Sequence, residues 1–200
     1  MEELADHVDP IERDGGEAMI EGRKTRLVAI SSDYLPLFNR WINDPEVADF
    51  LGVVGFPFNM AEERQWVERI LASGDTAAHF TILTKSGKPI GNMALIEISY
   101  LHRNAQLGIM IGEKSYWNKG FGTDAISTLL GFAFKSLGLN KVELRLNVDN
   151  RRALTCYKRC GFKIEGKKRE QTFYKGKYCD ELIMSVLRSD WERSRAKRKP

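Results

Sequence analysis

The sequence predicts an α/β fold, a single domain in which one mixed β-sheet is flanked by helices. Its 200 residues suit one domain, and shares of 42% hydrophobic and 29% charged residues are ordinary for a globular protein. Apolar residues recur with the period of a strand in some segments and of a helix in others, in the order β-α-α-β-β-β-α-β-α-β-β. No internal repeat interrupts this order, which is typical of one sheet covered by helices.

The first part of the chain carries clear signals for helix ends. Residues 31–33 can cap a helix that follows a strand, and Pro45 ends that helix because proline lacks an amide N–H. A later segment is expected to be a loop because glycines and a proline interrupt it. The predicted elements are a strand at residues 26–30, a helix at 35–42, a helical turn at 46–50, the loop at 51–59 and a helix at 61–71.

In the second part of the chain most segments have the spacing of strands, and a glycine closes each helix. Gly138 follows the helical pattern of residues 123–137, and Gly161 follows a shorter helix at 151–160. Residues 85–88 have the composition of a hairpin turn. The predicted strands are 79–84, 90–99, 104–112, 142–148, 162–165, 170–174 and 181–186.

The two ends of the chain differ in charge from the middle. Residues 1–18 carry seven acidic residues against one arginine, and residues 188–200 carry six basic residues against two acidic ones. Neither end has a sustained apolar period, so we predict a disordered acidic leader at 1–18, a domain at 19–191 and a basic tail at 192–200. No aromatic residue lies among the basic residues of the tail, and with a net charge of only +4 no nucleic-acid partner is expected.

Cysteine usage and hydropathy exclude several other classes of protein. Cys156, Cys160 and Cys179 lack the spacing of a disulfide framework, and no histidine beside them completes a metal site, so we interpret them as packed free thiols. No apolar run approaches the roughly 20 residues that span a bilayer, and the acidic N-terminus lacks a secretory pattern. A cytoplasmic protein without bound metal or membrane contact is therefore expected.

A glycine-rich turn between the strand at 104–112 and the helix at 123–137 is the first candidate ligand site. Gly120 and Gly122 let the backbone approach a ligand without a Cβ, and the first N–H groups of the helix have no partner within it. Such a helix start binds phosphate or pyrophosphate, and Lys119 can add positive charge. A tight strand-to-helix connection explains the turn equally well by itself. The turn matches neither a Walker P-loop nor a Rossmann fingerprint.

A second pattern lies roughly 30 residues downstream of the glycine-rich turn. Asn150 can cap the helix at 151–160 and offers its amide to a ligand. Ala153 and Tyr157 are four residues apart and therefore share a helix face. Gly161 ends the helix before the next strand. Taken alone, this pattern also describes an ordinary capped helix with a half-buried tyrosine.

In this order, the two patterns together resemble the GNAT superfamily of N-acetyltransferases. The glycine-rich turn is similar to the family's pyrophosphate motif, and residues 150–162 match its Asn-x-x-Ala-x-x-x-Tyr-x-x-x-Gly-Phe motif. The similarity extends from about Thr25 to Trp191 and so covers nearly the whole domain. Trp117 is a departure, because the family usually has Arg or Gln at this position.

Two branches of the superfamily are similar to different parts of the chain. Residues 41–47 and the Tyr116-Trp117 pair look like the ribosomal-protein (RimJ/RimL-type) branch. Residues 94–103 and 147–162 look like spermidine N-acetyltransferases. The resemblance implies a mostly antiparallel sheet whose two central strands diverge as a V.

The resemblance also implies acetyl-CoA as cosubstrate. Backbone groups of residues 109–111 are expected to bind the pantetheine arm, and a backbone N–H there is expected to stabilise the oxyanion formed from the thioester. The full set of expected cofactor contacts is Ile109, Met110, Ile111, Trp117, Asn118, Lys119, Gly120, Phe121, Gly122, Thr123, Asn150 and Tyr157.

Tyr157 falls on the family's catalytic tyrosine and is the expected general acid for the CoA thiolate. An ordinary tyrosine pKa of about 10 and a thiol pKa of about 8.5 make full proton transfer unfavourable by only about 2 kcal/mol. Glu97 is expected to be the general base, directly or through water, although a solvent-facing strand carboxylate explains it equally well. Glu113 is a weaker candidate base. Glu46 and Asp49 could bind a cationic acceptor or could be surface charges.

The sequence leaves the acetyl acceptor open. The first hypothesis is direct attack by a small primary amine in a ternary complex, with a polyamine preferred. The second is a protein N-terminal acetyltransferase of the ribosomal-protein type, and the third is a non-catalytic acyl-CoA-binding regulatory module. Amino sugars and aminoglycosides also fit as acceptors. Relatives often form dimers or larger rings, so a homo-oligomer is expected.

Overall fold

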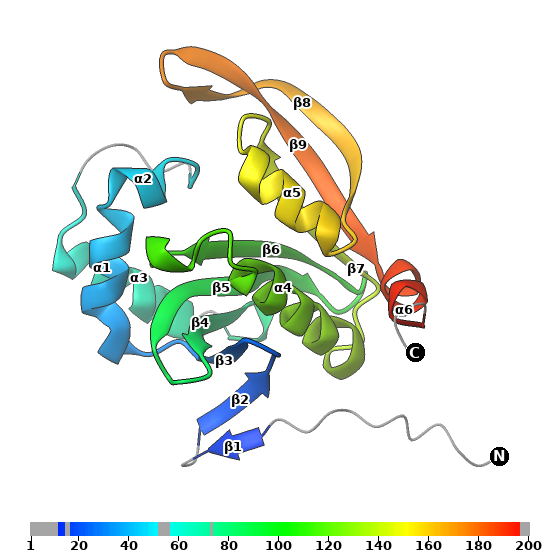
Figure 1. Ribbon diagram of the computed structural model, residues 1–200, viewed down its shortest axis with the longest axis horizontal. Helices are drawn as coiled ribbons and strands as arrows, with labels where there is room; N and C mark the ends of the chain where they lie inside the picture. The colour runs from blue at the N-terminus through cyan, green and yellow to red at the C-terminus, as the bar shows by residue number, and fades with distance from the viewer. Residues whose placement is uncertain (1–11, 15–16, 52–56, 73, 197–200) are drawn as a thin grey trace.

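The computed structural model describes residues 12–14, 17–51, 57–72 and 74–196 (Figure 1). Within them, one sheet contains nine strands in the order β1-β2-β3-β4-β5-β6-β7-β9-β8. The strands are β1 (Glu12–Asp14), β2 (Glu17–Glu21), β3 (Thr25–Ala29), β4 (Ala78–Thr84), β5 (Pro89–Ser99), β6 (Asn104–Ile111), β7 (Lys141–Asn147), β8 (Lys163–Tyr174) and β9 (Lys177–Leu187). The helices are α1 (Leu35–Ile42), α2 (Pro45–Ala48), α3 (Met60–Leu71), α4 (Phe121–Gly131), α5 (Arg151–Arg159) and α6 (Arg188–Ala196).

The central strands β6 and β7 are parallel neighbours, whereas the other neighbouring strands described here are antiparallel. Their pairing reaches only as far as Gln106 of β6 and Glu143 of β7. β6 nevertheless continues along β5 to Ile111, and β7 continues along β9 to Asn147. The two central strands therefore diverge, which confirms the predicted mostly antiparallel sheet with a V-shaped splay at its centre.

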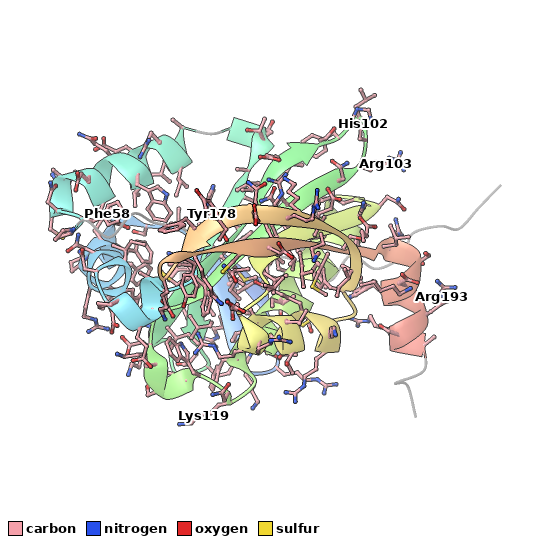
Figure 2. All side chains as sticks on the ribbon, turned by 90° about the horizontal axis from the view of Figure 1, so that it is seen from above. Phe58, His102, Arg103, Lys119, Tyr178 and Arg193 are labelled. Atoms are coloured by element: carbon pink, nitrogen blue, oxygen red, sulfur yellow. The ribbon has the colours of Figure 1, made fainter. Side chains whose placement is uncertain are left out.

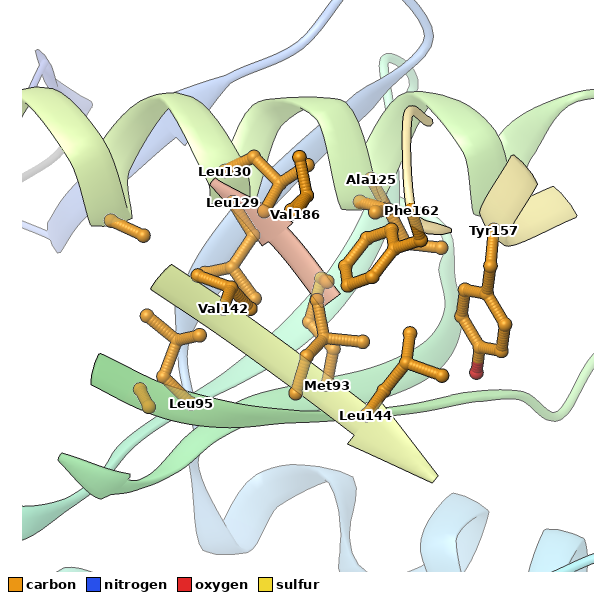
Figure 3. Packing of buried hydrophobic residues seen from close by; sticks show 14 of the residues in the cluster. Met93, Leu95, Ala125, Leu129, Leu130, Val142, Leu144, Tyr157, Phe162 and Val186 are labelled. Atoms are coloured by element: carbon orange, nitrogen blue, oxygen red, sulfur yellow. The ribbon is translucent and has the colours of Figure 1, made fainter. Parts of the chain in front are cut away.

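Helices pack against both faces of this sheet (Figure 1). α4 and α5 cover one face, where Leu129 of α4 and Val142 of β7 are completely buried in the main core (Figure 3). α1 and α3 bury Trp41 in a second cluster. Ile109 packs on the main core while its neighbour Met110 belongs to the second cluster, and successive strand residues point to opposite faces. β6 therefore lies between the two helical layers.

Asp124, in the first turn of α4, fixes the position at which this helix begins. Its carboxylate accepts hydrogen bonds from the backbone N–H groups of Lys24 at 2.8 Å and Thr25 at 2.9 Å, and from the Thr25 hydroxyl at 2.8 Å. The turn before β3 approaches so closely that a Cβ on Gly22 would lie 2.6 Å from the Asp124 carboxylate. A carboxylate at a helix N-terminus is also favoured by the helix dipole. The start of α4 is thereby held against the sheet.

The predicted boundaries at the two ends of the domain need correction. The expected leader at 1–18 overlaps β1 and β2, which form a hairpin, and β2 pairs with β3. Residues 1–11 lie outside the described part of the chain. The expected tail from residue 192 overlaps α6, which is anchored by the buried Trp191 packing on Phe134 at 5.5 Å between ring centroids. Edge strands and exposed helices tolerate charged residues, so the charge pattern did not reveal these elements.

One strand at the C-terminal end was predicted as two. Residues 162–165 and 170–174 were expected to be separate strands, but residues 163–174 form the one strand β8, which pairs with β9. The pairing shifts register between Ile164 and Gly166 and again between Lys168 and Thr172. Such bulges interrupt the alternation of apolar and polar residues. None of the described helices is long and apolar enough to cross a membrane.

Glu63 of α3 is a buried carboxylate, 7% exposed, without a hydrogen bond or ion pair to its side chain among the described residues. Burial raises the pKa of Glu63, so the native state disfavours its charged form. This penalty is fully present above the native pKa and vanishes below the unfolded value of 4.5. Glu63→Gln is therefore expected to raise the Tm at pH 7 by about 2 °C, with a smaller gain near the unfolded pKa.

Thermal unfolding of both forms at the two pH values checks this prediction. Glu68→Gln is the matched control, because Glu68 lies on the same helix and is exposed. A Glu63→Gln variant that melts below the parent protein at pH 7 would show that the carboxylate stabilises the fold.

Candidate active site

A cavity of about 630 Å³ opens where β6 and β7 diverge. Its walls come from both central strands, the turn before α4, one face of α5, and the residues around α2. The lining residues on the strands are Gln106, Leu107, Gly108, Ile109, Met110, Ile111, Arg145, Leu146 and Asn147. Those on the turn and helices include Val47, Phe50, Leu51, Tyr116, Trp117, Asn118, Gly120, Gly122, Thr123, Ile126, Asn150, Arg152, Ala153, Thr155, Cys156, Tyr157 and Arg159.

The turn before α4 has the backbone of an anion site. Asn118 and Gly120 both adopt left-handed conformations, with φ of 58° and 84°. Gly120 is the N-cap residue, and no side chain caps the helix. The Asp124 N–H donates to the Gly120 carbonyl at 3.0 Å and so makes the first hydrogen bond within the helix. The backbone N–H groups that precede Asp124 in the first turn of α4 therefore remain available to a ligand. An exposed helix N-terminus preceded by left-handed residues is a favourable place for phosphate oxygens.

Trp117 is held in place beside this turn and carries a cation. Its indole N–H donates to the Ile111 carbonyl at 2.7 Å, and the Arg152 guanidinium lies 3.6 Å from the centre of a Trp117 ring. Guanidinium groups stack favourably on indole rings. Arg152 of α5 thus supplies a positive charge where the family's usual Arg or Gln has been replaced by tryptophan.

Two residues of the turn that were predicted as cofactor contacts are not part of the cavity wall. Lys119 lies at the outer edge of the molecule (Figure 2), and its carbonyl accepts a hydrogen bond from Lys24 Nζ at 2.9 Å. Phe121 packs edge-on against Tyr116, with ring centroids 4.9 Å apart. Lys24 also lies 5.6 Å from the centre of the Phe121 ring. The sequence did not reveal that Lys24 contacts this turn, because Lys24 lies about 100 residues earlier in the chain.

Tyr157 is placed on the cavity by α5, whose first turn is capped by Asn150. The Asn150 side chain accepts a hydrogen bond from the Ala153 N–H at 3.0 Å, as its position in the sequence predicts. Tyr157 is 8% exposed and packs against Phe162 at the edge of the main core (Figure 3). Its hydroxyl has no hydrogen-bond partner among the described residues and is free to donate to a ligand. Burial, with a further contribution from the thiols Cys156 and Cys160, raises the pKa of Tyr157 well above its ordinary value.

Cys156 also lines the cavity, although its sequence position suggested only a packed thiol. Its Sγ lies 3.3 Å from the Thr123 hydroxyl, at the start of α4. A hydrogen bond with Cys160, opposed by burial and assisted by Thr123, lowers the pKa of Cys156 to about 7. A thiol of this kind is a stronger nucleophile at neutral pH than an ordinary cysteine.

The structure does not bring the predicted carboxylates into the cavity. Glu97 is exposed on a bulge of β5 with a left-handed φ of 53°. Glu113 forms an ion pair with Arg40 and accepts a hydrogen bond from the Trp41 indole at 3.1 Å. Among the lining residues that the structure describes, the charged ones are arginines, Arg145, Arg152 and Arg159. Transfer of a proton to Glu97 would therefore have to pass through water.

Two further carboxylates lie on and just after α2, and both have cationic partners. Glu46 binds Lys114 at 3.0 Å, and Asp49 accepts hydrogen bonds from the Tyr174 hydroxyl at 2.7 Å and from Lys175 at 2.9 Å. Asp49 immediately precedes Phe50, which lines the cavity. Glu46 in turn precedes Val47, another lining residue, so both of the predicted acceptor-binding residues adjoin the cavity wall.

Comparison with known proteins identifies the family to which this chain belongs. The acetyltransferase (GNAT) domain matches residues 24–163. Spermidine N(1)-acetyltransferase of Vibrio cholerae is 38% identical over 102 residues, which are 51% of this chain and 58% of that enzyme. The corresponding enzyme of Escherichia coli K12 is 30% identical over 105 residues, which are 52% and 56% of the two chains. The matched part thus spans little more than half the length of these curated relatives.

The fold agrees with a solved structure over a longer stretch. Spermidine N-acetyltransferase from Vibrio cholerae, crystallised in complex with CoA and spermine, aligns with a TM-score of 0.78 and 27% sequence identity. The alignment covers 84% of this chain and 98% of the Vibrio chain. With the family domain matching more than half of the sequence, the chain belongs to the GNAT acetyltransferase family.

Proposed function

We propose that this protein transfers the acetyl group of acetyl-CoA to a primary amine of a small molecule, with a polyamine as the preferred acceptor. The observation that carries the proposal is the convergence of three features on one cavity. These are the splayed strands β6 and β7, the uncapped N-terminus of α4, and the Tyr157 hydroxyl. The polyamine preference is supported by the similarity to spermidine N-acetyltransferases.

The turn at residues 117–123 would bind the pyrophosphate of CoA, with Arg152 contributing positive charge from α5. Residues 109–111 of β6 lie beyond the point where pairing with β7 ends, so backbone groups on that edge can bind the pantetheine arm. A backbone N–H of this strand would polarise the thioester carbonyl and stabilise the oxyanion, typically a contribution of about 3–4 kcal/mol. Gly108 lines the cavity, and no atom lies within 4 Å of the place that a Cβ on Gly108 would occupy. The thioester would therefore have room beside this residue.

The Tyr157 hydroxyl would stabilise the leaving CoA thiolate by donating a hydrogen bond to it. Because burial raises the pKa of Tyr157, the hydroxyl keeps its proton at neutral pH, and full proton transfer is less favourable than ordinary pKa values imply. The acceptor amine must be neutral to attack the thioester carbonyl. Since no carboxylate lines the described cavity, its ammonium proton would leave through water, with Glu97 as the proposed final acceptor.

The test is an acetyl-transfer assay that follows free CoA thiol with a panel of acceptors. The panel holds spermidine, spermine, butylamine, an aminoglycoside and a peptide with a free N-terminus. We expect thiol release with the small amines and acetylated amines by mass spectrometry. Release with the peptide alone would favour the protein N-terminal reading. Binding of acetyl-CoA without thiol release from any acceptor would favour the regulatory module and contradict the proposal.

A further inference from the structure

The β8–β9 hairpin meets the end of α2 in an arrangement that binds an ammonium group. The Lys175 ammonium donates to the Asp49 carboxylate at 2.9 Å and lies 4.8 Å from the centre of the Tyr174 ring. The Tyr174 hydroxyl donates to the same carboxylate oxygen at 2.7 Å. The Phe50 ring stacks on the Tyr174 ring, with the two ring centroids 5.0 Å apart. A carboxylate beside an aromatic face is a common binding site for alkylammonium ions.

This arrangement adjoins the wall of the cavity. Phe50 and Leu51 line the cavity, and Asp49 is the residue just before them. The charged lining residues among those described are Arg145, Arg152 and Arg159, which repel a cation. A second ammonium of an acceptor would therefore be favoured outside the arginine-lined part. Asp49 offers a negative charge at that place.

The exposure of Lys175 indicates that its ammonium can dissociate from the Asp49 carboxylate. Its side chain is 65% exposed, whereas that of Asp49 is 27% exposed. Exposed ion pairs contribute little to stability because water screens them. Burial opposes ionisation of Asp49, but hydrogen bonds from Tyr174 and Lys175 outweigh it and keep the Asp49 pKa below its ordinary value. The carboxylate is consequently charged at neutral pH and able to exchange one ammonium for another.

We propose that Asp49, Phe50 and Tyr174 form a subsite for the second ammonium of a diamine or polyamine acceptor, and that Lys175 occupies this subsite until the acceptor displaces it. The side chain of Lys175 is itself an alkylammonium, so it has the chemistry of the ligand it competes with. The inference rests on the proposed amine acetylation and names the feature that would select acceptors with two charges.

Two substitutions should act in opposite directions on KM. Asp49→Asn removes the carboxylate charge and is expected to raise the KM for spermidine about 10-fold, the usual size of a lost charged hydrogen bond, with kcat unchanged. Lys175→Gln removes the internal competitor and is expected to lower that KM several-fold. Neither change should alter the KM for butylamine, which has no second ammonium.

A second ion pair on the same hairpin provides the controls. Lys167 binds Asp180 at 2.6 Å, so Lys167→Gln and Asp180→Asn remove the same charges away from the cavity and should leave all constants unchanged. Parallel losses in Asp49→Asn and Lys175→Gln with every amine would mean that the pair only fastens the hairpin, and would overturn the proposal. If the parent protein acetylates no amine, the proposed function fails. Calorimetric titration with spermidine then decides the subsite alone, and equal affinity in parent and Asp49→Asn would reject it.

Discussion

Tyr157→Phe is expected to lower kcat by about 10²–10³-fold while leaving the affinity for acetyl-CoA unchanged. The hydroxyl lies on the cavity wall without a hydrogen-bond partner among the described residues, and the ring is held by packing against Phe162. Removing the oxygen alone preserves the ring contacts, so the fold and the cofactor site should persist. Steady-state kinetics with the best acceptor, together with calorimetric binding of acetyl-CoA, measures both quantities.

The control for this substitution is Tyr178→Phe, which removes the hydroxyl of a tyrosine that is 66% exposed on the hairpin. A second readout is the pH profile of kcat. Because the pKa of Tyr157 is raised, the parent enzyme should show no loss of kcat from tyrosine ionisation up to pH about 10, the ordinary tyrosine value. An unchanged kcat in Tyr157→Phe would remove the tyrosine from the mechanism.

Gly122→Val is expected to weaken acetyl-CoA binding about 10–100-fold, because it fills the space beside the helix N–H groups that would bind pyrophosphate. A Cβ at Gly122 would lie 3.8 Å from Cys156 Sγ and 3.8 Å from a side-chain carbon of Ile111. These are ordinary van der Waals distances between cavity-lining residues, so a Cβ there does not disturb the fold, whereas a side chain would occupy space that the pyrophosphate needs. Fluorescence or calorimetric titration with acetyl-CoA, and Tm without ligand, check the two halves of this expectation.

Gly131 provides the matched control on the same helix. A Cβ there would lie 3.9 Å from the Trp191 ring, at a half-buried position that does not line the cavity. Gly131→Ala should therefore leave acetyl-CoA affinity at the parent value. Equal affinity in Gly122→Val and the parent protein would show that the cofactor does not bind at the start of α4.

The features that could be predicted from the sequence are those set by residues close together in the chain. The glycine-rich turn predicts the start of α4, and Asn150 predicts the cap of α5, because both depend on local backbone conformation. The resemblance to a known family then supplied the splay between β6 and β7, which no local pattern indicates. The same resemblance singled out Tyr157, which the structure places on the cavity wall.

The features that could not be predicted depend on contacts between distant segments. In the sequence Asp124 looks like an ordinary acidic residue in the first turn of a helix. In the structure its carboxylate binds the backbone N–H of Lys24, which lies 100 residues earlier in the chain. Asp49 and Tyr174 are 125 residues apart and meet only because the β8–β9 hairpin reaches α2. For Glu97 the sequence left a role as general base and a solvent-facing strand position equally open, and a bulge in β5 leaves the residue exposed.

The proposed direct attack has one chemical rival inside the cavity itself. Cys156 lines the cavity and has a pKa of about 7, so a thiolate could in principle accept the acetyl group before the amine does. In the direct mechanism Tyr157 assists departure of CoA only when the amine attacks. The two mechanisms therefore differ in what happens before any acceptor is added.

Release of CoA thiol on mixing protein with acetyl-CoA, first without and then with spermidine, tests the account most directly. Intact-mass measurement of the protein accompanies each step. Direct transfer predicts no thiol release and an unmodified protein until the amine is added, and then one CoA for each acetylated amine. One equivalent of CoA released before the amine, with an acetyl group on the protein, would contradict it.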